Sequence, residues 1–258
     1  MPKFAANLTM LFTDKPFLDR FAAASAAGFN AVEFLFPYDH PAQQVADAAR
    51  AAGLQVVLHN LPCGNWAGGE RGLACLPDRM HEFRAGVTKA IEYAAALGAP
   101  QLNCLAGLAA QGDAAAHKTL VENVRFAADA LKSAGIRLLV EPVNTRDVPG
   151  FFVTTTQQGL QIIDEAGSDN VRLQYDIYHA QVMEGDLLPT IERTLPRIGH
   201  IQIADNPGRN EPGTGEINYP YVFRRLDELG YAGWIGCEYK PSAAGLAWMQ
   251  PYLHAQAA

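Results

Sequence analysis

The sequence predicts an α/β protein that folds as a single closed (β/α)₈ barrel, the TIM barrel. Three observations support this prediction. Eight short apolar runs recur along the chain, Ala-rich amphipathic stretches lie between them, and no linker or low-complexity tract divides the 258 residues. Alternating strands and helices favour a parallel sheet. We therefore expect one barrel domain over residues 1–258, with no second domain.

The expected strands and helices follow this alternation from one end of the chain to the other. Strands are expected at residues 4–8, 31–36, 54–59, 101–105, 137–141, 171–176, 198–203 and 234–238. Helical patterns include residues 17–27, 79–97, 113–134, 156–166 and 219–229. Glycines stand where helices should end, at Gly28, Gly53, Gly98, Gly135 and Gly230. An open doubly wound sheet is the alternative, but it usually carries a glycine-rich phosphate loop, and the chain contains no GxGxxG or GxxxxGK[ST] motif.

Composition argues against several classes of partner. The chain has 20 Lys and Arg against 27 Asp and Glu, a formal charge of −7, whereas binders of nucleic acid or of anionic membranes need clustered basic residues. The uncharged stretch 93–112 is interrupted by glycine, proline and amides, so no membrane span is expected. Four widely spaced cysteines and the lack of a signal peptide predict reduced thiols in a cytoplasmic protein. Self-association into a homo-oligomer is compatible with this composition.

The last four strands share one pattern of alternation. Side chains of a barrel strand point in turn toward the helices and toward the barrel axis. One choice of parity gives apolar helix-facing positions at Leu138, Val140, Leu173, Tyr175, Ile201, Ile203, Ile235 and Cys237. The same parity turns an oxygen-bearing side chain inward at each carboxyl end, at Glu141, Asp176, Gln202 and Glu238. Active sites of barrels gather at these ends.

Three carboxylates and a carboxamide brought together need a counter-charge. A divalent cation supplies one, and a set of oxygen ligands suits a hard ion, Mg²⁺ or Mn²⁺. The sequence therefore predicts a metal site made of Glu141, Asp176, Gln202 and Glu238. The alternative is a purely structural polar network.

Several motifs resemble the hydroxypyruvate isomerase family, within the xylose-isomerase-like barrels. The motifs are Val140-Glu141-Pro142, residues 174–179 (QYDIYH), residues 200–205 (HIQIAD), residues 215–219 (GEINY) and residues 236–241 (GCEYKP). The resemblance also covers residues 4–8 and 31–38, and so nearly the whole chain. It implies that the four residues named above hold the metal, and that Glu141 and Glu238 are the catalytic proton donor and acceptor.

The expected reaction is the metal-dependent interconversion of hydroxypyruvate and 2-hydroxy-3-oxopropanoate through an enediolate. A keto or hydroxy acid as substrate needs its own carboxylate and hydroxyl groups held. The candidate substrate-binding residues are His59, His179, Arg209 and Lys240. The alternatives are a solvated loop cation at Arg209, a buried structural histidine at His59 and a salt-bridged Lys240. We further expect Glu33 to orient His59, or else to form a buried salt bridge, and Trp66 to cover the substrate or to pack at the surface.

Three other activities stay in competition. An isomerase of a longer 2-oxo acid such as 2-oxotetronate shares these motifs. A ketose 3-epimerase has the same metal and glutamate pair but acts on a neutral sugar, which the positive charge at Arg209 and Lys240 disfavours. Metal-assisted hydrolysis by the endonuclease branch of these barrels uses many histidines, whereas the seven histidines of this chain are spread singly.

Overall fold

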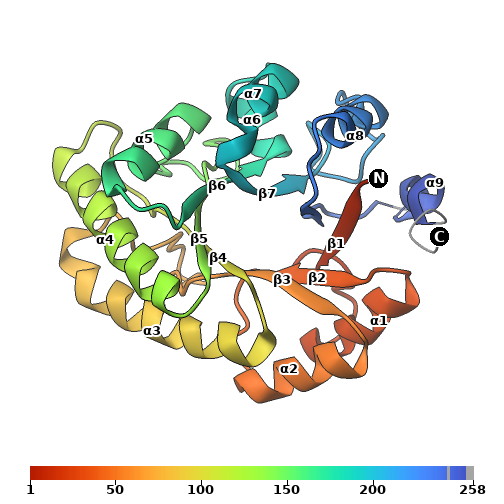
Figure 1. The fold of residues 1–258 in the computed structure, drawn as a ribbon, viewed down its shortest axis with the longest axis horizontal. Helices are drawn as coiled ribbons and strands as arrows, with labels where there is room; N and C mark the ends of the chain where they lie inside the picture. Colours follow the sequence, from red (N-terminus) through yellow and green to blue (C-terminus); the bar gives the residue numbers. More distant parts are fainter. Residues whose placement is uncertain (243–244, 254–258) are drawn as a thin grey trace.

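The structure is a computed structural model that describes residues 1–242 and 245–253. In this part of the chain the strands pair in parallel from β1 to β8, and β1 pairs back to β8, so that the sheet closes into a barrel (Figure 1). The strands are β1 (Lys3–Asn7), β2 (Ala31–Phe34), β3 (Gln55–Asn60), β4 (Gln101–Cys104), β5 (Arg137–Val140), β6 (Val171–Asp176), β7 (Ile198–Ile203) and β8 (Trp234–Cys237). The predicted barrel is confirmed, with every strand within two residues of its expected bounds.

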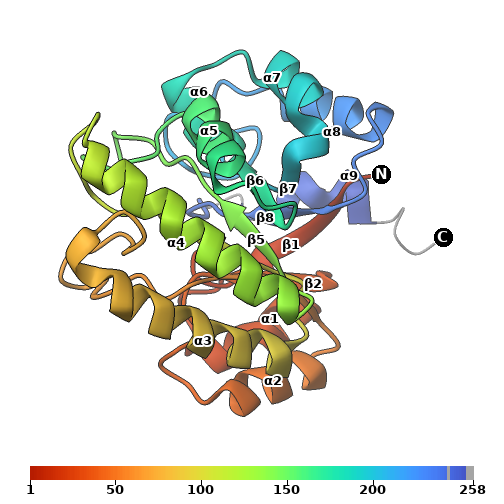
Figure 2. The same cartoon turned by 60° about the vertical axis from the view of Figure 1, so that its left-hand side comes forward.

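Helices surround the sheet (Figures 1 and 2). They are α1 (Arg20–Ala26), α2 (Ala42–Ala51), α3 (Met80–Leu97), α4 (Ala114–Ser133), α5 (Thr156–Ala166), α6 (Ile177–Met183), α7 (Leu187–Thr194), α8 (Tyr219–Glu228) and α9 (Gln250–Leu253). Short 3₁₀ turns lie at Phe17–Asp19, Pro77–Arg79, Leu195–Arg197 and Ala247–Met249. The five helical patterns singled out in the sequence are all present, and α2, α6, α7 and α9 are additional helices. No helix in the described ranges is long and apolar enough to cross a bilayer.

Glycine ends the helices as expected. Gly98 follows α3 in the left-handed conformation, with φ of 66°, which costs a glycine little because it has no Cβ. The other predicted helix-ending glycines, Gly28, Gly53, Gly135 and Gly230, also have positive φ. The chain can therefore leave each helix sharply and enter the next strand.

The apolar core forms in two places. The larger part lies between barrel and helices and includes all eight positions predicted to face the helices, so the parity assigned to β5–β8 is confirmed. A small cluster of Ala5, Ala31, Val57, Leu58 and Leu139 is separate from it. Ala5 and Ala31 are paired on β1 and β2.

A buried polar layer around Glu33 links strands across the barrel interior. The Glu33 side chain is fully buried, and its Oε1 accepts from Asn7 Nδ2 at 2.9 Å and from Gln202 Nε2 at 2.7 Å. Its Oε2 lies 2.6 Å from His200 Nε2. Glu33 and His200 therefore have the geometry of a buried ion pair. The expectation that Glu33 orients His59 is wrong.

The register of β3 explains why Glu33 and His59 do not meet. The pairing of β2 with β3 is irregular between Val32 and Glu33, after which Phe34 pairs with His59. His59 therefore lies on the helix-facing side with Phe34, whose ring stacks on it at 6.2 Å between centroids. Its neighbour Asn60 points to the opposite side, because adjacent strand residues alternate.

The glycine at position 236 allows this polar layer to form. A Cβ added to Gly236 would lie 2.3 Å from Glu33 Oε2. We predict that Gly236→Ala lowers the free energy of unfolding by about 2 kcal/mol, since overpacking a filled interior costs about 1–3 kcal/mol. Urea unfolding of purified variants measures this change.

Gly86→Ala is the matched control. A Cβ there would make only ordinary contacts, 3.4 Å or more from Pro62, and the residue lies within α3. We expect its stability to equal or exceed that of the parent by up to about 1 kcal/mol. An unchanged free energy of unfolding in Gly236→Ala would contradict the close packing against Glu33.

Candidate active site

Three carboxylates meet at the carboxyl ends of the strands. Glu141 follows β5 directly, Asp176 is the last residue of β6 and Glu238 follows β8, and all three are buried. One ligand atom from each of these residues and from His179 can be chosen so that all four lie within 4.8 Å of one another. The structure thus brings together three of the four residues predicted as metal ligands, with His179 as the fourth member of the cluster.

Helix α6 sets the positions of Asp176 and His179. Asp176 caps this helix, because its Oδ1 accepts from the backbone N–H groups of Tyr178 at 2.8 Å and His179 at 3.4 Å. The other oxygen, Oδ2, is buried and has no hydrogen-bond partner among the described residues. A buried carboxylate oxygen without a hydrogen bond, next to two further carboxylates, fits a hard divalent cation as its missing partner.

The proton on His179 can be placed from its neighbours. The backbone N–H of Asn144 donates to His179 Nδ1 at 3.3 Å, and the Asn144 side-chain nitrogen lies 2.5 Å from the same atom. Burial lowers the pKa of His179 to about 4, so the ring is neutral near pH 7. Because Nδ1 accepts, Nε2 carries the proton. Nε2 lies 3.5 Å from Asp176 Oδ2 and 4.0 Å from Glu141 Oε1.

Gln202 lies near the carboxyl end of β7, where it is the register partner of Asp176 on β6. Its Oε1 accepts from Gln174 Nε2 at 2.6 Å, and its Nε2 donates to Glu33. Both ends of this amide are therefore engaged within the barrel. Its assignment as a metal ligand stays a prediction.

Burial raises the pKa of both glutamates of the site. Burial, followed by the nearby charge of Asp176, raises the pKa of Glu141 to about 8, against the effect of a 2.6 Å hydrogen bond from Asn103. Burial also raises the pKa of Glu238, and Arg209 acts in the opposite direction. With a pKa of about 8, Glu141 can carry a proton near neutral pH in the metal-free protein.

Arg209 reaches the site from the loop after β7. Its Nη2 lies 2.8 Å from Glu238 Oε2 and 3.9 Å from Asp176 Oδ2, and its Nη1 lies 3.3 Å from Asp147 Oδ2. Asp205 holds the loop in shape by accepting backbone N–H groups of Gly213, Gly215 and Ile217. The guanidinium thus lies at the mouth as predicted, paired with carboxylates of the protein.

A cavity of about 410 Å³ opens above the carboxylates. Glu141, Glu238, His179, Arg209 and Lys240 line it. His59 does not, because the register of β3 turns it toward the helices, and Asn60 lines the cavity in its place. The expectation that His59 stands at the mouth is therefore wrong.

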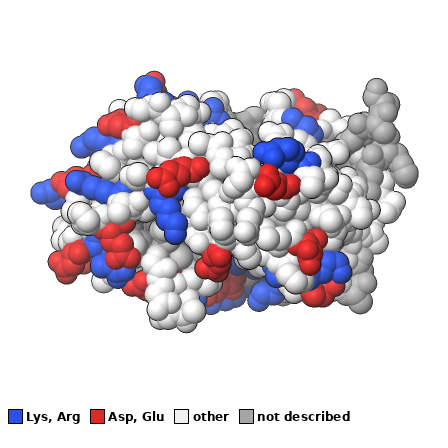
Figure 3. Space-filling view, turned by 90° about the horizontal axis from the view of Figure 1, so that it is seen from below, with Lys and Arg blue, Asp and Glu red and all other residues white. Residues whose placement is uncertain are grey.

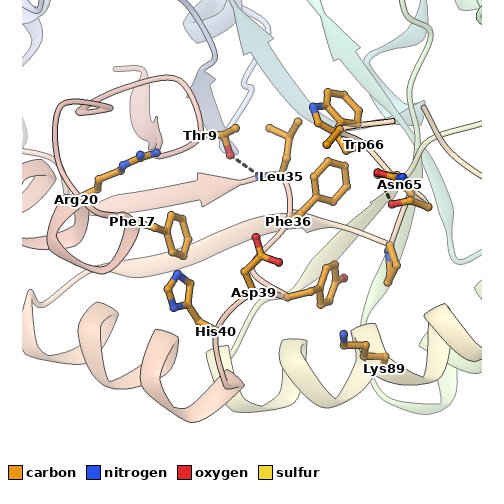
Figure 4. A pocket seen from close by; sticks show the side chains of 15 residues that line it. Thr9, Phe17, Arg20, Leu35, Phe36, Asp39, His40, Asn65, Trp66 and Lys89 are labelled. Atoms are coloured by element: carbon orange, nitrogen blue, oxygen red, sulfur yellow. Dashed lines mark hydrogen bonds between the residues drawn. The ribbon is translucent and has the colours of Figure 1, made fainter. Parts of the chain in front are cut away.

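A larger hollow of about 640 Å³ lies beside the mouth cavity (Figure 4). The two share Thr9, Leu35 and Trp66, and the Trp66 ring lies close to Phe36, at 5.2 Å between centroids. None of the clustered carboxylates lines this hollow. The chemistry of the site therefore belongs to the smaller cavity, with Trp66 as part of the wall between the two.

The motifs did not point to Asn103, Asn144, Asp147 or Arg71, which also shape the mouth. Asn103 donates to Glu141, Asn144 fixes the ring of His179, and Asp147 pairs with Arg209. Asn103 alone left a signal, as a polar residue inside an apolar strand. The others lie on loops whose course does not follow from alternation.

Comparison with known proteins places the chain in a family. The family model described as xylose isomerase-like TIM barrel matches residues 21–254. Hydroxypyruvate isomerase of Escherichia coli (strain K12) is 52% identical over 257 residues, which cover 98% of this chain and 100% of that protein. The 2-oxo-tetronate isomerase of Cupriavidus necator is 50% identical over 258 residues, covering 98% and 99%. The chain belongs to the xylose isomerase-like TIM barrel family.

A solved structure agrees with this assignment. A crystal structure from Brucella melitensis, described as AP endonuclease, family 2, has a TM-score of 0.94 and 46% identity to this chain. The similarity covers 98% of this chain and 99% of that one. Both the barrel and its surrounding helices are therefore shared over nearly the full length.

The raised pKa of Glu141 predicts a stability effect in the metal-free protein. Between about pH 4.5 and 8 the folded state keeps a proton on Glu141 that the unfolded state releases, so the stability falls as the pH rises through this window. We predict that Glu141→Gln removes this loss and raises the free energy of unfolding at pH 7 by about 1–3 kcal/mol. Urea unfolding with EDTA at several pH values measures it.

Glu92→Gln serves as the control for that measurement, because Glu92 is exposed on α3. The free energy of unfolding of this variant should depend on pH as it does in the parent. In Glu141→Gln, the free energy of unfolding could instead fall with pH between 4.5 and 8 as steeply as in the parent. The Glu141 carboxyl group would then not hold a proton in the folded state, and the raised pKa assigned to it would be wrong.

Proposed function

We propose that this protein is a divalent-metal-dependent isomerase that interconverts hydroxypyruvate and 2-hydroxy-3-oxopropanoate. One observation carries the proposal: Glu141 and Glu238 lie together with a buried Asp176 oxygen that lacks a partner, all at the mouth of the barrel. The names of the relatives at 50–52% identity support an isomerase. In this proposal the barrel is the catalytic domain.

Glu141, Asp176, Gln202 and Glu238 would hold the metal. Gln202 would join this set through its amide oxygen, which accepts from Gln174 Nε2 in this structure. When bound, Mg²⁺ or Mn²⁺ supplies positive charge that stabilises negative oxygen on the substrate. The same charge lowers the cost of keeping three buried carboxylates ionised.

Glu141 and Glu238 move the proton. One of these carboxylates removes a proton from C3 of hydroxypyruvate, which gives an enediolate. The hydroxyl proton passes from the C3 oxygen to the C2 oxygen, and return of the abstracted proton to C2 gives 2-hydroxy-3-oxopropanoate, so that no atom is gained or lost.

The substrate is oriented by the polar groups of the mouth cavity. His179 Nε2–H donates to a substrate oxygen, since the ring is neutral and its Nδ1 accepts from Asn144. Arg209 and Lys240 line the same cavity and reduce the net negative charge that an acid meets there. Asn60 takes the position on β3 that the sequence assigned to His59.

A longer 2-oxo acid is the second candidate substrate. The cavity of about 410 Å³ has room for more than three carbons, and one relative at 50% identity is a 2-oxo-tetronate isomerase. A ketose 3-epimerase is disfavoured because a neutral sugar gains nothing from the cations that line the cavity.

A nuclease is disfavoured by charge. The chain carries a formal charge of −7, and on the face shown in Figure 3 basic and acidic side chains are intermixed, without a basic patch. The partner is a small keto or hydroxy acid, with no nucleic acid and no membrane, and the chain is free to form a homo-oligomer. Its four cysteines are buried and unpaired, which suits the reducing cytoplasm.

The direct test is an NMR assay in D₂O on three- to six-carbon keto acids and ketoses, with and without a chelator. We predict deuterium at C2 of the product and at C3 of recovered hydroxypyruvate, and loss of exchange after complete chelation. Turnover that survives chelation would remove the metal from the mechanism, and exchange only with neutral ketoses would favour the epimerase.

The same assay tests the two glutamates. Glu141→Gln and Glu238→Gln should each lower kcat by about 10²–10⁴-fold, the usual contribution of a positioned acid or base. Glu92→Gln, on the exposed face of α3, should retain the parent rate. Near-parental kcat in both active-site variants would refute the assignment of proton transfer to this pair.

A further inference from the structure

Arg71 is a cation at the mouth for which no function has been given so far. It lies in the segment 61–76 between β3 and the turn Pro77–Arg79, and it lines the mouth cavity together with Glu141 and Glu238. Within residues 1–242 and 245–253 it forms no salt bridge with any acid. An unpaired guanidinium at the rim of an acidic site is a group available to an anionic ligand.

The guanidinium is held in place by neutral groups. It stacks on the Trp66 ring, 4.1 Å from the ring centroid, and its Nη1 donates to the backbone oxygens of Trp66 at 3.0 Å and Glu70 at 2.8 Å. Glu70 does not neutralise it, since its carboxylate pairs with Arg79 at 2.6 Å. The Nε and Nη2 groups of Arg71 have no hydrogen-bond partner in the described ranges.

The segment that carries Arg71 is fixed at its base. The backbone N–H of Gly72 donates to Cys63 at 3.1 Å, and that of Cys75 donates to Ala106 at 2.8 Å. Gly72 also lies so close to the segment after β4 that a Cβ there would be 2.3 Å from the Leu105 oxygen. Arg71 is therefore presented by a braced segment, so little ordering is needed when it binds a ligand.

Trp66 packs against a further aromatic side chain on the side away from the mouth cavity. Its ring meets Phe36, from the segment after β2, in the wall shared with the neighbouring hollow (Figure 4). The stacked pair of Arg71 and Trp66 thus belongs to the mouth cavity on one side and is backed by an aromatic side chain.

The other two cations of the cavity are less suited to a carboxylate. Arg209 lies within 4.0 Å of carboxylate oxygens of Glu238, Asp176 and Asp147, so its charge is already compensated. Lys240 is exposed and offers a point charge on a flexible stem. Arg71 has a planar guanidinium with free donors, the geometry that can bind a carboxylate through two hydrogen bonds.

We propose that Arg71 binds the carboxylate of the substrate and selects acids over neutral ketoses. This inference rests on the proposed function, because it takes a 2-oxo acid as the substrate. Arg71 is in this account a specificity-determining residue: it contacts the end of the substrate that does not react, while Glu141 and Glu238 act on the carbons that do.

The test compares an acid with its neutral analogue. Hydroxypyruvate and dihydroxyacetone differ by a carboxylate in place of a hydroxymethyl group, and D-glycerate and glycerol are a non-reacting pair for binding measured by NMR titration. Arg71→Gln should raise KM for hydroxypyruvate and weaken D-glycerate binding by about tenfold or more. It should leave kcat/KM for dihydroxyacetone within about twofold, and Arg71→Lys should restore part of the loss.

Arg84→Gln is the matched control, since Arg84 also stacks on an aromatic ring, that of Phe126 at 4.9 Å, but is exposed on α3. Its KM and kcat/KM for both substrates and its affinity for D-glycerate should equal those of the parent. Equal losses for the acid and its neutral analogue in Arg71→Gln would show that Arg71 only supports Trp66, and would overturn the proposal. Parental binding of D-glycerate in Arg71→Gln would overturn it as well.

Failure of the proposed function gives a different result. If the parent protein turns over no 2-oxo acid, the isomerase assignment fails, and the D-glycerate titration still decides the role of Arg71. Selective loss of D-glycerate binding in Arg71→Gln would then support carboxylate recognition by this residue, and unchanged binding would refute it.

Discussion

The site depends on the electrostatic cost of gathering three carboxylates in a buried place. Glu141, Asp176 and Glu238 come from three strands, and closure of the barrel leaves them within 4.8 Å of one another. The positive charge of Arg209 offsets part of the repulsion between the carboxylates. Protonation of Glu141 offsets another part, as its raised pKa indicates. A divalent cation would offset the rest. The buried Asp176 oxygen that forms no hydrogen bond is the atom that most needs this positive charge.

The layer beneath the carboxylates keeps them in register. Glu33 joins side chains from β1 and β7, and Asn7 lies between Glu33 and Glu238, with its Nδ2 3.4 Å from Glu238 Oε1. Because these bonds cross the barrel interior, a shift of one strand would disturb its neighbours. A rigid second layer of this kind is what precise proton transfer requires, since small displacements of an acid or base cost much of its effect.

The sequence predicted the barrel and the carboxylate cluster because both follow from simple periodicity. Alternation along β5–β8 is regular enough to place Glu141, Asp176 and Glu238 on one side. The same alternation gave the wrong side for His59. An irregular register between β2 and β3 reverses the parity there, so that Asn60 faces the mouth cavity instead. Contacts across the barrel, such as Glu33 with His200, and the course of the loop bearing Arg71 depend on closure and on loop packing, which no single strand encodes.

The most direct test of this account is a titration of the metal-free protein with Mn²⁺, followed by the electron paramagnetic resonance signal of the free ion. The account predicts one saturable site per chain, weakened about tenfold or more by Asp176→Asn, because the oxygen without a partner belongs to that residue. Asp129→Asn, an exposed change on α4, should bind as the parent does. Absence of a saturable site, or equal affinity in Asp176→Asn and the parent, would contradict it.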